Sequence, residues 1–315
     1  MPCQAGPVAV TDPVDRLISL GTQAVTVPWR LLESAAAPVR ADLSRGVRRA
    51  LGVSDTPRPR VMDPDLAFMH PDSVTRRVHA DLPSMVIGGM AALLLQTLHP
   101  LAMAGVAEHS AYEDNPLGRL RRTAAFVGTT TFGTDQEARQ AIALVRGIHR
   151  KVRGTAPDGR PYSANDPELL TWVHVAEMAS FLDAVQRFGP QRFTGEECDA
   201  YFAETSVIAL DLGAEWAPRS RDEVAAYFAR VRPELYAGRQ ALDARDFLFR
   251  GLSRRPQDQA SHAVIVGAAV SVLPGWARRE LRIPNPPLFD RAVVDPAARL
   301  WCAGLRWALS GSARG

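Results

Sequence analysis

The stretch 149–174, HRKVRGTAPDGRPYSANDPELLTWVH, begins and ends with a histidine, and each histidine lies on an otherwise apolar helical stripe. The two stripes run through Ala138, Ile142, Val145, His149 and Val152, and through Leu170, His174, Met178, Phe181 and Val185. Steps of three and four residues place the members of each stripe on one face of a helix. Two such helices, joined by a short loop, can clasp a buried metal or haem between their imidazoles.

Capping signals bound these two helices. Thr134-Asp-Gln-Glu137 is a capping box that predicts the start of the upstream helix, and Gly154 is expected to end it. Asp158-Gly159 predicts a turn in the connecting segment. Asp166, Pro167 and Glu168 then supply the N-cap, the first-turn proline and the first-turn carboxylate of the downstream helix. The stretches 194–197 and 220–223 and the pair Asp295-Pro296 predict three more helix starts.

The stretch 85–107, MVIGGMAALLLQTLHPLAMAGVA, carries no formal charge and is long enough to cross a bilayer. It also contains three glycines and Pro100, whose ring should end or kink a helix. We expect a buried central helix that ends near His99, because the centre of a large all-helical protein also requires a helix that is apolar on all sides. A membrane-spanning helix is the alternative.

Alternating strand patterns and internal repeats are nearly absent, so the sequence predicts an all-α protein with a single large helical domain over residues 61–315. Residues 1–60 are expected to form a looser N-terminal helical arm, broken at Pro28 and Pro38 and detached at 57–59. The predicted cofactor pocket lies between the core helices.

Composition argues against several classes of protein. The 315 residues carry a net charge of +3, and the basic residues are dispersed rather than clustered as in a nucleic-acid groove. The three cysteines are far apart and form no CxxC pair, so neither a zinc knuckle nor a disulfide framework is expected. The N-terminus lacks the pattern of a signal peptide, and a cytoplasmic location is the expectation.

The absence of several well-known motifs excludes further kinds of active site. The chain has no HExxH, no GxSxG and no GxxxxGK[ST], and it offers only the reversed order His174-x-x-Glu177 where a di-iron bundle needs Glu-x-x-His pairs. With these motif-defined sites excluded, the remaining hypothesis is a buried cofactor held by histidines between helices. Two further hypotheses stay open: a haem- or lipid-binding protein without turnover, and a scaffold whose histidines are ordinary core residues.

Several neighbours of the two histidines are candidates for the same site. Glu177, one turn after His174, can orient that imidazole through its second nitrogen, or it can be a solvated helix residue. The basic residues 146–153, Arg150 among them, can pair with haem propionates or simply form a solvent-facing helix end. His99 precedes a proline, where a histidine is often only a cap, but it is retained as a cofactor-binding candidate.

Four blocks of sequence resemble the MpaB-type oxygenase family, which is related to the latex-clearing rubber oxygenases. They are LLLQTLHPLAMAGVAEHSAY (93–112), GRLRRTAAFVGTTTFG (118–133), RGIHRKVRG (146–154) and GRPYSANDPELLTWVHVAEMASF (159–181). The resemblance covers about residues 65–275. It implies an all-helical fold, haem b bound through a histidine of a core helix, and oxidative cleavage of a double bond or of a prenyl side chain with O2.

Carried over by position, the resemblance makes His174 the iron ligand on the proximal side of the haem. It places Arg146 and His149 on the distal side as catalytic candidates. The glutamate proposed as a base in rubber oxygenases has no clear counterpart here, so cleavage of rubber itself is not expected. The expected function is that of a haem-b-dependent oxygenase acting with O2 or peroxide on a hydrophobic small molecule of unsaturated or prenyl type. No nucleic-acid partner and no transmembrane helix are expected, and a homo-oligomer is left open.

Overall fold

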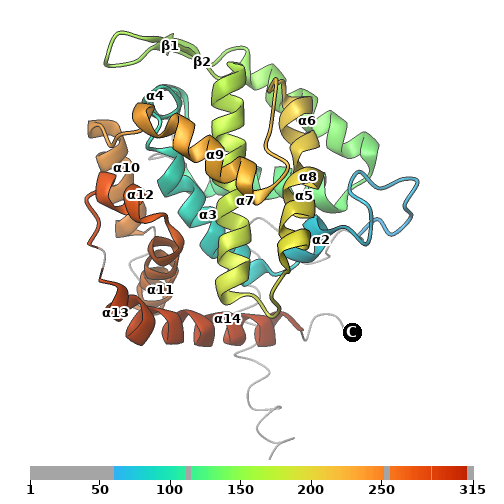
Figure 1. Cartoon of the computed structure of the whole chain (residues 1–315), viewed down its shortest axis with the longest axis vertical. Coiled ribbons are helices and arrows are strands. Elements are labelled where there is room, and N and C mark those ends of the chain that lie inside the picture. The colour runs from blue at the N-terminus through green and yellow to red at the C-terminus, as the bar shows by residue number, and fades with distance from the viewer. Residues whose placement is uncertain (1–59, 111–114, 252–255, 285, 311–315) are drawn as a thin grey trace, which may run out of the picture.

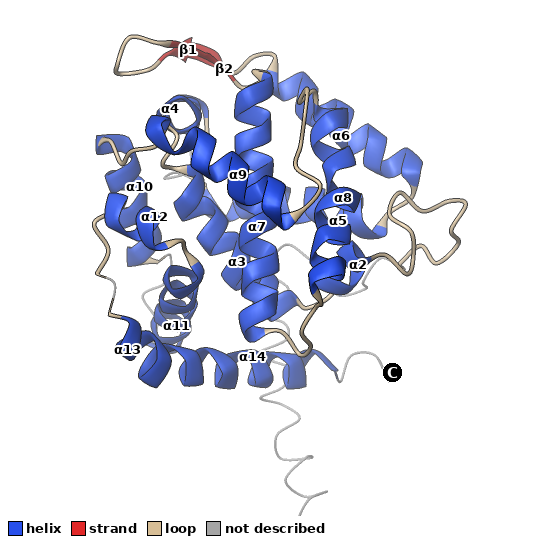
Figure 2. Cartoon of the chain, viewed as in Figure 1, coloured by secondary structure: helices blue, strands red, loops and turns tan. Residues whose placement is uncertain are grey.

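The computed structural model describes residues 60–110, 115–251, 256–284 and 286–310 (Figure 1). The helical arm expected at residues 1–60 lies outside the described residues, apart from its last residue. Helices make up most of the described chain, and two short strands pair as an antiparallel hairpin (Figure 2). The all-α single-domain prediction is confirmed.

The elements in chain order are α2 Val74–His79, α3 Leu82–Gln96, α4 Pro100–His109, α5 Pro116–Phe132, α6 Asp135–His149, β1 Arg153–Thr155, β2 Pro161–Ser163, α7 Pro167–Phe188, α8 Gly195–Leu212, α9 Arg221–Val231, the 3-10 turn η1 Arg232–Glu234, α10 Arg239–Arg250, α11 Pro256–Val272, α12 Gly275–Glu280, α13 Pro287–Phe289, the π-helical turn η2 Asp290–Val294 and α14 Asp295–Ser310.

Helix α7 runs through the middle of the molecule and packs most extensively against α3 (Figure 1). Ile87 and Leu94 of α3 and Trp172 of α7 are completely buried in the main core between these helices and their neighbours. The axes approach closely at Gly88, where an added Cβ would lie 2.9 Å from Phe181 Cα and from the Ser180 carbonyl oxygen. The prediction of a buried central helix is therefore confirmed for α3.

The apolar stretch 85–107 is divided between α3 and α4. Helix α3 ends at Gln96, and Pro100 occupies the first turn of α4, where its missing N–H costs nothing. The two helices are bent by 106° at this break. Among the described residues, no single helix has the length and apolar character needed to cross a membrane. Within these residues, only this bent pair, taken together, has that length and apolar character.

The capping predictions hold at several helix starts. Thr134 with Glu137, and Thr194 with Glu197, form reciprocal capping boxes at α6 and α8. Asp166 accepts a hydrogen bond from the Glu168 backbone N–H at the start of α7. Each cap satisfies backbone donors that the first turn of a helix leaves without partners.

The predicted helix end at Gly154 is wrong. Helix α6 ends at His149, and Gly154 lies in β1, opposite Tyr162 of β2. An added Cβ at Gly154 would lie 2.6 Å from Tyr162 Oη, so the glycine makes room for the tyrosine rather than stopping a helix. The predicted turn at Asp158-Gly159 closes the hairpin, with Gly159 at a φ of +87°.

Helix α14 lies along one edge of the molecule, at the bottom of Figure 1. Arg306 donates two hydrogen bonds of 2.7 Å to Asp81, and a third of 2.6 Å to the Phe188 carbonyl oxygen. Arg187 pairs with Asp295 at 3.0 Å. These contacts fix the inner face of α14 to the α3–α7 pair.

Candidate functional site

His174 lies near the middle of the central helix α7 and is 6% exposed. Its predicted stripe neighbours Leu170, Met178 and Phe181 are buried with it. His174 forms no hydrogen bond with any residue that the structure describes. Burial lowers its pKa to about 4, so the imidazole is neutral at neutral pH and keeps a nitrogen lone pair for a ligand.

His79 shows what a histidine with a purely structural role looks like in the same core. Its Nδ1 lies 2.7 Å from Thr131 Oγ1 and its Nε2 lies 2.9 Å from Tyr201 Oη. Both ring nitrogens are therefore satisfied, as buried polar groups normally are. Burial lowers the pKa of His79 to about 3, so this imidazole is neutral as well. The difference between His79 and His174 lies in their hydrogen bonds and not in their charge.

Two carboxyl groups follow His174 along α7. Glu177 is half-buried and forms no hydrogen bond with a described residue, and burial raises its pKa to about 7. Asp183, two turns further, is reached by solvent, yet the protein around it raises its pKa to about 6. The sequence analysis singled out Glu177 but missed Asp183, which has no motif around it.

Replacing Glu177 with glutamine is expected to stabilise the cofactor-free protein above neutral pH. The carboxyl has a pKa of about 7 in the folded state, above its ordinary value of 4.5. Its ionisation therefore lowers the free energy of unfolding as the pH rises from 4.5 to about 7. Glutamine has no ionisable group, so the variant avoids this loss of stability. The gain should be near zero at pH 4.5 and reach about 2 kcal/mol above pH 7.

Urea unfolding of both proteins across this pH range measures the gain. Glu168→Gln, at an exposed position on the same helix, is the control for the replacement of a glutamate as such. A gain for Glu177→Gln that does not change with pH would contradict the assignment to charge burial.

The residues predicted on the distal side lie on α6. His149 is half-buried, its Nδ1 is inaccessible and has no hydrogen-bond partner among the described residues, and burial lowers its pKa. Arg146 is exposed and donates to the Asp211 carbonyl oxygen of α8 at 3.3 Å. Arg150 is exposed at the C-cap of α6, and its carbonyl accepts a hydrogen bond of 2.7 Å from Arg153.

The helices that carry His149 and His174 do not form a closely packed pair. Helix α6 packs against α5 and α8, and α7 packs against α3 and α8. Helix α8 is thus the shared neighbour that holds the two helices in place relative to each other. The apolar stripe on α6 correctly marked its inner face, where Ala138 and Ile142 are buried, but it could not show which helix that face meets.

His99 lies on a different side of α7 from the side that carries His174. It is the N-cap of α4, is buried, and has an Nδ1 without a partner among the described residues. Its ring centroid lies 6.0 Å from that of Trp172. Trp172 and His174 are two residues apart on a helix, which separates their side chains by about 200° around the axis. His99 therefore lies against the side of α7 that faces away from His174.

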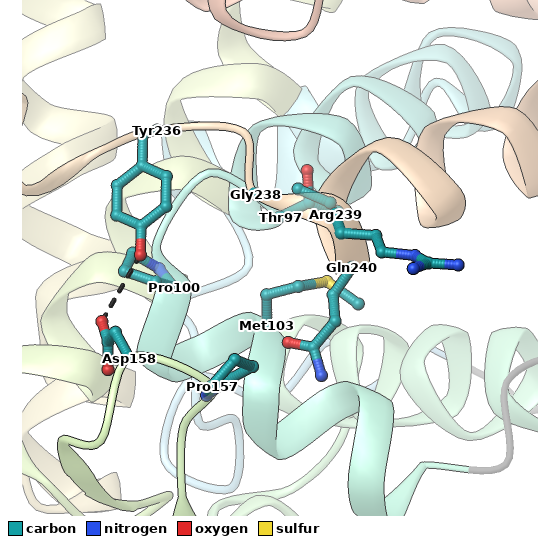
Figure 3. Close-up of a pocket in the computed structure, with 10 residues that line it drawn as sticks. Thr97, Pro100, Met103, Pro157, Asp158, Tyr236, Gly238, Arg239 and Gln240 are labelled. Carbon is teal, nitrogen blue, oxygen red and sulfur yellow. Dashed lines mark hydrogen bonds between the residues drawn. The ribbon is translucent and has the colours of Figure 1, made fainter.

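A cavity of about 100 Å³ opens between α4, the hairpin and the start of α10 (Figure 3). Its lining includes Met103 and Gln240, and Tyr236 Oη donates to Asp158 Oδ2 across it at 3.4 Å. The cavity lining contains none of the predicted site residues. No residue of α7 lines it.

Within the described residues, no group of three or more His, Cys, Asp and Glu side chains is placed to hold a metal ion. A site whose metal ligands all come from the protein needs such a group. A haem would not need such a group, because the porphyrin itself would hold the iron and one protein side chain would suffice to attach it. His174, buried and without a hydrogen bond to a described residue, is a side chain of the kind that would serve.

The comparison with known protein families matches residues 76–307 to the catalytic domain described as ER-bound oxygenase mpaB/B'/Rubber oxygenase. No curated protein matches the chain, and no solved structure does. The matched range runs from α2 to α14 and includes every candidate residue described above. The chain therefore belongs to the mpaB and rubber oxygenase family, an oxygenase-related family whose catalytic domain it carries.

Proposed function

We propose that this protein is a haem-b-dependent oxygenase that acts with O2 or peroxide on a hydrophobic small molecule. One observation carries the proposal: a neutral imidazole, His174, is buried on the central helix with no hydrogen bond to a described residue. A neutral imidazole that makes no hydrogen bond keeps a nitrogen lone pair available for a ligand. Membership of an oxygenase-related family makes a haem iron the fitting partner.

In this proposal His174 is the protein's iron ligand. When bound, haem would supply the iron chemistry that activates O2 or peroxide. Neutral His174 needs no deprotonation to act as a ligand at physiological pH. Its attachment to the well-packed α3–α7 pair keeps the ring in a fixed position, as a precise site requires.

Two further side chains are proposed to handle protons and polar groups at the site. Glu177, with a pKa raised to about 7, exchanges a proton near neutral pH and suits a general acid or base. His149, which has an unpartnered Nδ1, and Arg146 would supply polar groups from α6 to the oxidant or the substrate. His99 is not included, because it lies on the other side of α7.

The surface beside His149 supports a hydrophobic substrate. Leu144 and Ile148 of α6 are exposed although both are large and apolar. Leu117 and Leu120 are also exposed, near the start of α5, which packs against α6. Exposed apolar surface of this kind often marks a binding site. We propose that an unsaturated or prenyl-type compound enters along it.

The test is an absorption spectrum of the protein purified from cells supplied with haem precursor, followed by oxygen-uptake measurements. We expect a haem Soret band that shifts on reduction, and O2 consumption with squalene but not with its saturated analogue squalane. Absence of the Soret band would contradict the haem assignment. A Soret band without squalene-dependent uptake of O2 or consumption of peroxide would indicate a haem-binding protein without turnover.

A further inference from the structure

The C-terminal helical run α13, η2 and α14 presents a large apolar surface to solvent. Leu288 is 79% exposed, Leu300 is 76% exposed, and Phe289 and Val293 are each at least half exposed. We call these four residues, with the exposed Arg291 and Arg299, the outer α14 face. The inner face of the same run is buried and held by the Arg306–Asp81 pair, so α14 is fixed with its apolar outer face turned outwards.

The charged side chains that this run leaves unpaired at the surface are positive. Its two acidic residues are both used in internal ion pairs: Asp290 with Arg278 at 2.7 Å, and Asp295 with Arg187 at 3.0 Å. Arg291 and Arg299 are exposed and form no ion pair with a described residue. The outer α14 face therefore combines leucine, phenylalanine and valine with two free guanidinium groups and no free carboxylate.

We infer that the outer α14 face binds an anionic lipid surface. A helix that exposes large apolar side chains flanked by arginine inserts its apolar side among lipid acyl chains, while its cations meet the anionic headgroups. In Figure 1, α14 lies along the edge of the molecule, so its outer side is turned away from the helical core. Docking would lay the protein on one leaflet without crossing it.

A second copy of this chain fits the same face less well. In a two-fold dimer the same patch meets itself, which would bring the Arg291 and Arg299 guanidinium groups of both copies to one interface. Like charges facing each other disfavour such an interface, and no free carboxylate of this run compensates them. An anionic membrane supplies the missing negative charge.

Co-sedimentation of the full chain with vesicles tests the inference, and it needs neither haem nor activity. We expect the protein to sediment with vesicles of phosphatidylcholine mixed with phosphatidylglycerol, and much less with phosphatidylcholine alone. Each arginine near an anionic surface contributes about a five-fold gain in binding, so Arg291→Gln with Arg299→Gln should bind about thirty-fold more weakly. Leu300→Glu should weaken binding by at least about ten-fold.

Leu66→Glu, which changes an exposed leucine in the loop before α2, away from the outer α14 face and from the proposed substrate surface, is the control and should bind like the unaltered protein. The substituted side chains are exposed, and thermal unfolding confirms that each variant is folded. Failure of the unaltered protein to sediment with anionic vesicles would overturn the inference. So would equal sedimentation of all variants, or a concentration-dependent dimer that Leu300→Glu abolishes.

Discussion

The variant His174→Ala is expected to purify as a folded protein without the haem absorption band. Loss of a polar group that only supports a metal ligand typically weakens metal binding by about 10- to 100-fold, and loss of the ligand itself should exceed about 100-fold. The folded chain should survive, because His174 makes no hydrogen bond with a described residue that the substitution would break. The cavity left by the ring should cost about 2 kcal/mol.

Two controls separate ligation from a merely structural effect. Free imidazole added to His174→Ala fits the space that the ring has left and should restore the Soret band. His99→Ala removes another buried histidine, but from the other side of α7, and should keep its haem. Loss of the band in His99→Ala together with its retention in His174→Ala would assign the iron to His99 and contradict our proposal.

Sequence reasoning predicted best where the cause is local. The capping boxes at Thr134 and Thr194 lie within four residues, and both are formed. The break before Pro100 follows from the missing N–H of one residue. The hairpin after α6 was missed because it depends on distant contacts. Tyr162 donates to Glu108 of α4 and packs with Ala104 and Ala156, and no short-range pattern contains that information.

The hydrogen bonding of the candidate site also depends on distant contacts, and the sequence did not predict it. The apolar stripes placed His174 in the core, but a stripe does not reveal whether a buried histidine has hydrogen-bond partners. His79 looked unremarkable in the sequence, and its partners Thr131 and Tyr201 come from two other helices. The absence of hydrogen-bond partners for His174 and the raised pKa of Asp183 became visible only when the neighbouring helices were in place.

The second large effect is expected at the crossing of the two central helices. Gly88→Ala should destabilise the protein by about 2 kcal/mol, although alanine is the better helix former by about 1 kcal/mol. The added Cβ would lie 2.9 Å from Phe181 Cα and from the Ser180 carbonyl oxygen. Both are backbone atoms, so no side chain can rotate to relieve the contact, and α3 has to move away from α7.

The adjacent Gly89 is the matched control. An added Cβ there meets only Phe181 Cε1, at 3.8 Å, which is an ordinary contact. Gly89→Ala should therefore stabilise the protein by up to about 1 kcal/mol. Urea unfolding of the two variants measures a difference of about 3 kcal/mol between adjacent positions. Equal stability of the two variants would mean that α3 and α7 tolerate a wider separation. In that case, the α3–α7 crossing could not be what fixes the position of His174.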